Sequence, residues 1–468
     1  MQIGGEIMFT GRDKELSRLE EMFQSGKFEF AVIYGRRRVG KTTLIQEFIK
    51  NKKAIYFVAM ESGEINNLQS ISQSIYSLTF PDSKKAPIFS SFSEVFENIT
   101  ALAKKERIVL VIDEYPYLAG VSKGISSVLQ SFIDQKFKNS NLFLILCGSS
   151  MSFMENQVLG YQSPLYGRRT AQFKIKPFDF QETLRWYKNF DLFEKAIVYG
   201  ITGGVPQYLE KIDDAISLKK NIMQCFLNEN SFLFEEPSNL LKQELRDPHI
   251  YNAIITAIAK GSSRLNEIAT KVGLPTSICN KYLTSLISLA IVKKEKPIIS
   301  QTRTSIYRLE DNMFRFWYRF VADNLTRIIS GLGEKVYEED IESNLPDFMG
   351  QVFEKICMQY LTQLNAKDKL EFSFKEIGRW WGNNPVLRTE QEIDILAYTE
   401  EQAIFAECKW TKDPVSSSVL ALLIEKSAIF TFRTKYYYLF SKSGFTANCK
   451  KVAQNNPLVR LVSFLEMY

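Results

Sequence analysis

One histidine, His249, is present among 468 residues, which leaves no basis for a histidine-rich metal site. The six cysteines are scattered and form no C-x-x-C pair, which argues against structural zinc and disulfides and fits a reducing compartment. No apolar run reaches the roughly 18 residues of a membrane-spanning helix, and the N-terminal residues lack a basic region and an apolar signal core. These absences predict a cytoplasmic protein that does not interact with membranes.

The composition is that of an ordinary globular protein, with 45% hydrophobic and 24% charged residues. At about 150 residues per domain, the length suggests about three domains. No repeat, heptad array or low-complexity tract stands out. The formal net charge of +6 permits nucleic-acid binding but does not require it.

A glycine-rich segment near the N-terminus, residues 35–42, matches the phosphate-binding pattern G-x-x-x-x-G-K-[ST] in full. The residues before it, 28–33, read as a buried strand, and residues 42–50 read as a helix, which is the context that the motif requires. The two glycines let successive backbone N–H groups face a phosphate. The predicted nucleotide-binding residues are Gly35, Arg36, Arg37, Arg38, Val39, Gly40, Lys41, Thr42 and Thr43.

The chemistry of this loop follows from two of its side chains. Lys41 would reach the β- and γ-phosphates of a nucleotide, and the Thr42 hydroxyl would be a ligand of Mg²⁺. A chance glycine-rich turn is the alternative, but the full pattern in its strand–loop–helix context argues against it. The sequence therefore predicts that ATP and Mg²⁺ bind here.

A partner for the loop follows a second apolar run, residues 107–112, which ends in Asp113 and Glu114. An unbroken apolar run suits a parallel strand that is buried on both faces. The carboxyl ends of such strands are where open α/β sheets bind ligands. Asp113 is predicted to hold Mg²⁺ through water, and Glu114 to polarise the water that attacks the γ-phosphate.

Three further strands complete the expected sheet. Residues 142–148 form a buried strand that leads into Ser149, which either orients the attacking water or belongs to a simple Gly-Ser turn. Residues 54–60 are another strand, and residues 173–178 are an edge strand closed by proline. Strands that alternate with helices predict a parallel α/β sheet.

A basic segment, residues 167–170, precedes the edge strand and offers Arg168 and Arg169. An arginine finger stabilises negative charge on a transferring phosphoryl group. Either arginine could serve as that finger. The alternative is an ordinary solvated basic loop, since surface arginines are common.

Three motifs together resemble the archaeal ATPase family of P-loop NTPases, relatives of the AAA+ and STAND classes. They are the F-x-G-R-x-x-E-L box at residues 9–16, the basic filling of the phosphate loop, and Gly203-Gly204-Val205-Pro206, which resembles the G-G-x-P motif of a helical lid. The resemblance covers roughly residues 8–320. It implies an ATPase core whose lid touches the nucleotide, and it names no substrate.

The middle of the chain reads as a winged helix. Helical patterns at residues 250–260, 263–273 and 277–289 precede two strand-like segments at residues 291–295 and 304–309. Two helices around a glycine-containing turn have helix–turn–helix geometry. The second would present Thr276, Ser277, Asn280 and Lys281 to a DNA major groove. Contact with another protein is the alternative.

The C-terminal third carries a second cluster of chemistry. Residues 390–398 and 402–410 read as a hairpin. Strand alternation puts Glu407 and Lys409 on one face, with Asp394 on the adjacent strand. Two carboxylates beside a lysine suit a Mg²⁺ or Mn²⁺ site that activates water against a phosphodiester. An ordinary charged hairpin is the alternative.

This constellation resembles the PD-(D/E)XK nuclease superfamily. The resemblance implies that Glu354, on a helix before the hairpin, is a further metal-site acid; Ile393 departs from the pattern, since it stands where proline would. Lys426 is expected on a solvated helix face. The segment Arg379-Trp380-Trp381 either stacks on bases or covers the core.

The sequence thus predicts an α/β protein with four segments: a P-loop ATPase core (1–180), a helical lid (181–245), a winged helix (246–325) and a restriction-endonuclease-like domain (326–468). The expected function is an ATP-regulated, DNA-directed enzyme, and a homo-oligomer is compatible with it. The alternative is a nucleotide-dependent switch or scaffold whose C-terminal domain binds a partner or nucleic acid without cutting it.

Overall fold

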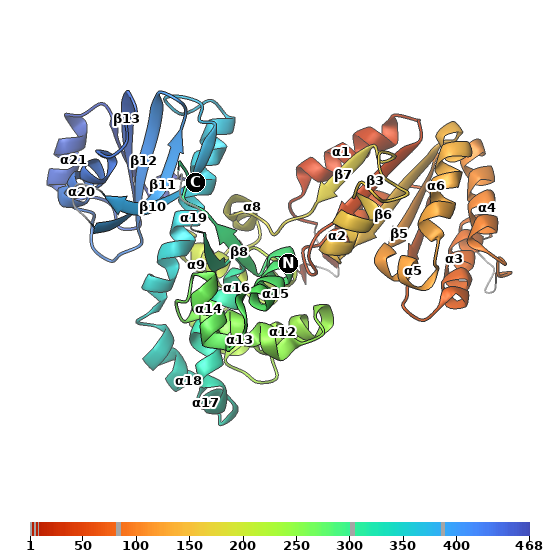
Figure 1. Cartoon of the computed structure of the whole chain (residues 1–468), viewed down its shortest axis with the longest axis horizontal. Coiled ribbons are helices and arrows are strands. Elements are labelled where there is room, and N and C mark those ends of the chain that lie inside the picture. Colours follow the sequence, from red (N-terminus) through yellow and green to blue (C-terminus); the bar gives the residue numbers. More distant parts are fainter. Residues whose placement is uncertain (1, 4–5, 8, 81–85, 300–304, 385–388) are drawn as a thin grey trace. The chain divides into compact units, whose positions relative to one another are not determined.

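A computed structural model describes residues 2–3, 6–7, 9–80, 86–299, 305–384 and 389–468. The chain divides into two compact units, each with its own sheet (Figure 1). Unit 1 is Met1–Phe178 with Val205–Gln207, and unit 2 is Asp179–Gly204 with Tyr208–Tyr468. Among the described residues, no helix is both long enough and apolar enough to cross a membrane.

Unit 1 contains a parallel five-stranded sheet. Its strands, in spatial order, are β4 (Ala54–Val58), β5 (Ile108–Asp113), β6 (Leu142–Gly148), β3 (Glu29–Tyr34) and β7 (Ala171–Lys174). The predicted parallel sheet is confirmed, and β7 lies at its edge. The edge strand begins and ends earlier than residues 173–178. A separate two-residue pair joins β1 (Gln2–Ile3) and β2 (Glu6–Ile7).

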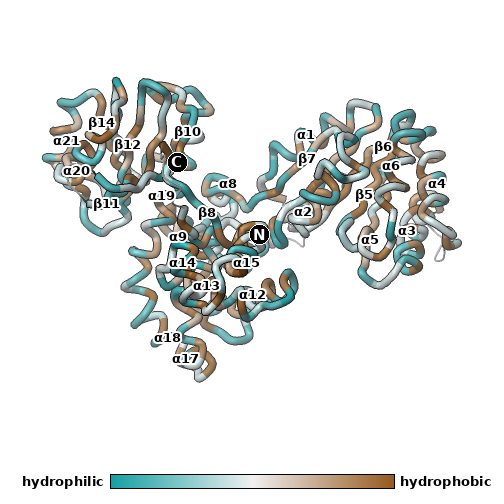
Figure 2. Tube along the Cα trace, in the orientation of Figure 1, coloured by the Kyte–Doolittle hydropathy of each residue, from teal (hydrophilic) through white to brown (hydrophobic). Residues whose placement is uncertain are grey.

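Helices cover both faces of this sheet, which explains why β5 and β6 are apolar without alternation. One face packs against α1 (Asp13–Gln24) and α2 (Lys41–Ile49). The other packs against α3 (Glu64–Thr79), α4 (Phe92–Lys105), α5 (Tyr115–Val121) and α6 (Ile125–Gln135). Every residue of β5 and β6 is buried, and Figure 2 shows the hydrophobic stretches inside this layer. Short helical segments follow at η1 (Phe137–Asn139), α7 (Met151–Phe153) and η2 (Met154–Val158).

Unit 2 begins with helices and continues into three helices and a hairpin. The first helices are α8 (Phe180–Leu184), α9 (Leu192–Thr202), α11 (Leu218–Phe226) and α12 (Phe232–Glu244), and α10 (Pro206–Leu209) starts within unit 1. Next come α13 (Pro248–Ala259), α14 (Leu265–Val272), α15 (Thr276–Ser288), β8 (Val292–Glu295) and β9 (Ile306–Leu309). β8 and β9 pair antiparallel. The predicted second strand started at Thr304, which lies outside the described residues.

A helical connection leads to the second sheet. It consists of α16 (Asn312–Phe316), η3 (Trp317–Val321), η4 (Ala322–Asn324), α17 (Leu325–Ile329), α18 (Gly333–Val336), η5 (Tyr337–Ile341) and α19 (Leu345–Ala366). The sheet consists of β10 (Glu376–Asn384), β11 (Thr389–Tyr398), β12 (Gln402–Lys409), β13 (Thr434–Ser441) and β14 (Val459–Ser463), in that spatial order. The first three strands are antiparallel, and the last two continue in parallel through α20 (Ser417–Ser427) and α21 (Ala447–Gln454). A last turn, η6 (Phe464–Glu466), follows β14.

The predicted mixed α/β class is confirmed, with a parallel core sheet and a separate C-terminal sheet. The division into four segments stays a prediction. The segments expected as lid, winged helix and C-terminal domain lie in unit 2, except for Val205–Gln207 of the lid, which belong to unit 1.

Candidate functional sites

The glycine-rich loop connects β3 to α2, and its backbone is bent as the motif predicts. Arg38 and Gly40 have φ angles of +73° and +83°, in the left-handed region. A Cβ atom on Gly35 would press against the carbonyl oxygen of Ile175. The loop therefore requires glycine at position 35 for close backbone approach and at position 40 for its conformation.

Lys41 lies buried inside this loop. Its Nζ atom donates hydrogen bonds to the carbonyl oxygens of Gly35 and Arg36, both at 2.9 Å. Burial lowers the pKa of the ammonium group. The positive charge is thus held by neutral carbonyl groups within the loop.

Asp113, at the end of β5, joins the loop to the sheet. Its Oδ2 atom accepts hydrogen bonds from the Thr42 hydroxyl at 3.0 Å and from the Tyr56 hydroxyl at 2.7 Å. Burial, and then the charge of Asp113, raise the pKa of Tyr56. Sequence reasoning missed Tyr56, because its contact with Asp113 depends on β4 lying beside β5.

Glu114 follows in the left-handed conformation, with φ +50°. Its Oε2 atom accepts hydrogen bonds from the Ser149 hydroxyl at 3.0 Å and from the Ser149 N–H group at 3.3 Å. The neighbouring strands β5 and β6 bring these residues together. Ser149 therefore orients the carboxylate that was predicted to polarise water.

The arginines of the loop contact other parts of unit 1. Arg37 donates to the Tyr117 hydroxyl at 2.8 Å, and Arg38 donates to Gln207 Oε1 at 3.0 Å. Pro206 lies 3.6 Å from the position of a Cβ atom on Gly40. The end of the G-G-x-P motif thus contacts the phosphate-binding loop.

The two candidate finger arginines have different surroundings. Arg168 forms a two-pronged ion pair with Asp134, at 2.6 Å from Nη2 and 3.0 Å from Nε to Oδ2. It also donates to the Pro164 carbonyl at 2.9 Å. The Arg169 charge acts on the Tyr34 hydroxyl. Arg168 would have to leave Asp134 before it could reach a phosphate.

On α15, the side chains predicted to face DNA are at the surface. Thr276, Ser277, Asn280 and Lys281 are exposed. The opposite side of the helix is buried through Leu283 and Leu286. The helix is therefore amphipathic, and its polar face is open to a partner.

In the C-terminal sheet, a β-bulge lies at Asp394. Gly378 pairs with Leu396 and Trp380 pairs with Ile393, so two residues of β11 stand opposite one residue of β10. Bulges re-aim side chains beside functional sites. The Asp394 Oδ2 atom accepts the backbone N–H of Cys408 at 2.8 Å. Burial, and then the charge of Glu407, raise the pKa of Asp394.

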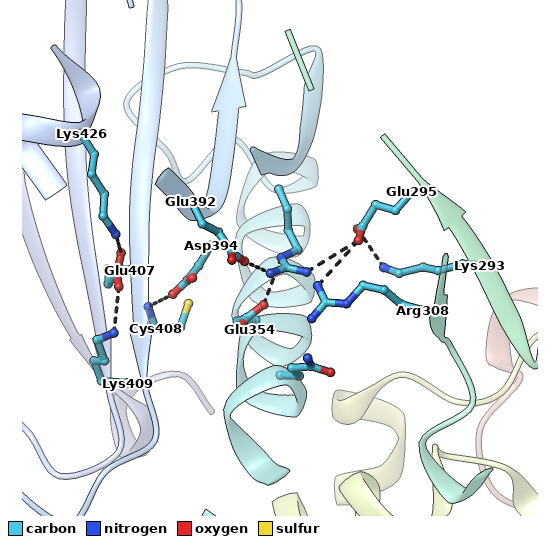
Figure 3. Close-up of polar contacts among 12 residues, drawn as sticks. Lys293, Glu295, Arg308, Glu354, Glu392, Asp394, Glu407, Cys408, Lys409 and Lys426 are labelled. Atoms are coloured by element: carbon cyan, nitrogen blue, oxygen red, sulfur yellow. Dashed lines mark hydrogen bonds and ion pairs between the residues drawn. The ribbon is translucent and has the colours of Figure 1, made fainter. Parts of the chain in front are cut away.

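Glu407 lies between two lysines, as Figure 3 shows. Lys409 Nζ is 2.8 Å from Glu407 Oε1, and Lys426 Nζ on α20 is 3.2 Å from Glu407 Oε2. Burial disfavours the charge on Lys409, but the Glu407 carboxylate outweighs burial and raises the pKa of this ammonium group. The expectation of a solvated Lys426 is wrong, because its side chain is only 14% exposed and reaches over the sheet to Glu407.

Glu354, on α19, lies on the other side of Asp394 (Figure 3). Burial, and then the charge of Asp394, raise the pKa of Glu354. Its carboxylate forms an ion pair with Arg379 Nε at 3.3 Å. Arg379 also pairs with Glu392, and with Glu295 of β8 at 3.7 Å.

The described residues contain no group of three or more His, Cys, Asp and Glu side chains arranged to hold a metal ion. The carboxylates predicted for that role are close enough to affect one another's pKa. However, Glu407 pairs with two lysines, and Glu354 pairs with Arg379. Trp380 is buried and packs edge-on against Phe430, so it covers the core. Trp381 is only partly buried.

Comparison with known proteins identifies two families that match parts of this chain. Residues 9–212 match a family described as an ATPase domain predominantly from Archaea, and residues 317–421 match a family described as Archaea bacterial proteins of unknown function. An uncharacterized protein of Methanocaldococcus jannaschii is 33% identical over 445 residues, which cover 93% of this chain and 96% of the relative.

Two more distant similarities are one of sequence and one of structure. An uncharacterized ATP-binding protein of Pyrococcus horikoshii is 24% identical over 242 residues, which cover 43% of this chain and 73% of the relative. The solved structure of a Walker-type ATPase of Pyrococcus abyssi has a TM-score of 0.50 at 23% identity, and the match covers 66% of this chain and 96% of that one.

Proposed function

The chain belongs to the archaeal ATPase family, and from this premise we propose that it binds ATP with Mg²⁺ and hydrolyses the γ-phosphate. One observation carries the proposal. A chain of hydrogen bonds links Thr42, Asp113, Glu114 and Ser149 at the carboxyl edge of one parallel sheet, and Lys41 precedes Thr42 in the loop. This edge is where open α/β sheets bind ligands.

The residues fit a magnesium nucleotide. The Thr42 hydroxyl and Asp113 Oδ2 lie 3.0 Å apart, so both could face one Mg²⁺, directly or through water. Bound Mg²⁺ would neutralise phosphate charge. Phosphate oxygens would replace the carbonyl partners of Lys41, and Glu114 would accept a proton from the attacking water.

Lys41→Ala tests nucleotide binding. The variant should lose affinity for ATP, because the ammonium group would otherwise pair with the β- and γ-phosphates. Undiminished ATP affinity by calorimetry would contradict the assigned role.

We further propose that unit 2 directs this ATPase to DNA and cleaves a phosphodiester with Mg²⁺ or Mn²⁺. The meeting of Asp394, Glu407 and Lys409 on adjacent strands supports this proposal. The two carboxylates would hold the metal, Glu354 would join them after leaving Arg379, and Lys409 would orient or deprotonate water. The exposed polar face of α15 would contact the DNA backbone.

A nucleotide-dependent switch or scaffold is the second candidate, and a specific observation favours it. Two lysines pair with Glu407, and Arg379 lies within ion-pair distance of Glu354. Such ion pairs can stabilise a fold without metal chemistry. In this reading the C-terminal sheet binds a partner or nucleic acid and does not cut it.

Incubation with single-stranded, duplex and branched DNA separates the two candidates. Each substrate is tested with Mg²⁺ or Mn²⁺, and with or without ATP, for the wild type and for Asp394→Ala. Cleavage that the wild type performs and Asp394→Ala does not would support the nuclease. Equal cleavage by both would indicate a contaminant, and binding without cleavage would support the switch.

A further inference from the structure

A large cavity lies within unit 2, and residues of unit 2 alone line it. Its volume is 1490 Å³, and its walls come from the end of α13, the start of α14, β9, α16, η3, α19 and β10–β11. This volume exceeds the roughly 300–1,000 Å³ of pockets for drug-sized ligands. The cavity is therefore large enough for an extended ligand.

Arginine is the cationic residue of the cavity wall: Arg264, Arg308, Arg315, Arg319 and Arg379. The acidic residues of the wall are Glu267, Asp347, Glu354, Glu390 and Glu392. Several of these groups are paired. Arg264 lies 3.9 Å from Glu267, Arg319 lies 2.7 Å from Asp347, and Arg379 pairs with Glu354 and Glu392.

Arg315 differs from these paired arginines. Its partners are neutral: Gln351 Oε1 at 2.5 Å, the Phe348 carbonyl oxygen at 3.0 Å, and the Phe348 ring beneath its guanidinium group. Within the described part of the chain its Nε atom has no hydrogen-bond partner and no carboxylate lies within ion-pair distance. Burial, and then the charges of Arg308 and Arg319, lower the pKa of Arg315 to about 9.

A partly buried cation whose direct partners are all neutral gains from binding an anion. Arginine suits phosphate in particular, because its planar group can donate two parallel hydrogen bonds. Arg308, Arg315 and Asp394 all act electrostatically on Glu354. The anion position at Arg315 therefore adjoins the candidate metal-dependent site.

The same wall contains an aromatic side chain that is not part of the core. Both tryptophans border the cavity, but Trp380 is buried in the sheet core, whereas Trp381 is only partly buried. Aromatic side chains in arginine-lined grooves stack on unpaired bases. Bases in a duplex already stack on one another, so this combination suits a single strand.

We propose that the cavity binds a single-stranded nucleic acid, with a backbone phosphate at Arg315 and Arg308 and a base against Trp381. The proposal rests on the proposed function of the C-terminal site, to which the cavity would deliver the strand. A phosphate that binds Arg379 would also release Glu354 from its ion pair. The substrate class is thereby narrowed from DNA in general to an unpaired strand.

The experiment measures binding without cleavage. The affinity of a fluorescent oligothymidylate is determined over a salt series for the full chain in EDTA, without ATP. Trp381→Ala should weaken binding about fivefold to a hundredfold through lost stacking. Arg315→Gln should weaken binding and reduce the salt slope by about one, because one phosphate contact is lost. Arg319→Gln gives a second test at a more exposed wall position.

Arg327→Gln is the matched control. Arg327 pairs with Glu339 and Asp340 in the same unit and is not part of the cavity wall, so its substitution should leave affinity unchanged. Thermal melting checks that each variant is folded. In a second control, heparin, a polyanion without bases, replaces the oligonucleotide. Trp381→Ala should not affect heparin binding.

Unchanged oligothymidylate affinity in folded Trp381→Ala and Arg315→Gln would overturn the proposal. An equal loss of affinity for oligothymidylate and for heparin in Trp381→Ala would also overturn it. So would tighter binding of duplex than of single-stranded DNA, if only Lys281→Glu weakens that binding. Asp394→Ala separates the two proposals: it should retain strand binding even if it abolishes cleavage. Strand binding by a chain that never cleaves would refute the nuclease and leave the cavity assignment intact.

Discussion

Glu114→Gln should stop ATP hydrolysis while leaving ATP binding intact. The substitution keeps the size of the side chain and an oxygen that can accept the Ser149 hydroxyl, now 3.0 Å away. It removes the negative charge and the basic oxygen that would take a proton from water. Thr42 and Asp113, the proposed magnesium residues, are untouched.

The expected size of the effect comes from the role of a general base. Such a group contributes typically 10²–10⁴-fold to a rate, which corresponds to about 3–5 kcal/mol of activation free energy. The free energy of unfolding should change little, because glutamine has the same side-chain length as glutamate and would adopt the same left-handed backbone conformation at residue 114. Ser149→Ala should lower kcat less, by about tenfold, because Glu114 would remain but lose one orienting hydrogen bond.

The assay is release of inorganic phosphate under saturating ATP, together with ATP affinity by calorimetry. Glu106→Gln is the control, since Glu106 is an exposed glutamate that pairs with Lys53. Wild-type hydrolysis by Glu114→Gln would refute the role of Glu114. Loss of ATP affinity in the same variant would refute the separation of binding from chemistry.

Four further predictions concern other parts of the chain. Lys281→Glu should weaken duplex DNA binding and flatten its salt dependence, because a phosphate contact is lost; unchanged affinity in filter binding at low and moderate salt would indicate a protein-contact role. Asp394→Ala should abolish cleavage and weaken Mn²⁺ binding, whereas Lys409→Ala should abolish cleavage but keep most of the metal affinity, as calorimetry would show; neither should alter ATP binding. The pKa of Glu354 is raised above its ordinary 4.5 in the folded state, so the folded state binds more protons there and the free energy of unfolding falls as pH rises above 4.5. Glu354→Gln should flatten this fall in the free energy of unfolding, measured by urea unfolding in EDTA from about pH 5 to about pH 8. Gly35→Ala should destabilise unit 1 by about 1–3 kcal/mol through overpacking against the Ile175 carbonyl, with a normal melting temperature as the contrary result and Gly350→Ala, where nothing lies within 4 Å, as the control.

Much of the fold was predictable because its signals are local. A phosphate-binding loop needs particular residues at fixed spacing, and a strand buried on both faces is apolar throughout, so residues 35–42 and 107–114 were identified from the sequence alone. The same holds for the amphipathic helix α15 and for the hairpin that carries Asp394 and Glu407. Each of these features depends on backbone geometry within one or two neighbouring elements.

The partners of these residues were not predictable, because they come from distant parts of the chain. Tyr56 reaches Asp113 only because β4 is the neighbour of β5. Lys426 reaches Glu407 because α20 packs on the sheet, and the Arg379 ion pairs join β8, α19 and β11. The sequence by itself determined which residues can carry the chemistry. Only the tertiary structure decided which charges are neutralised, because strand order and helix packing bring together groups that no local pattern relates.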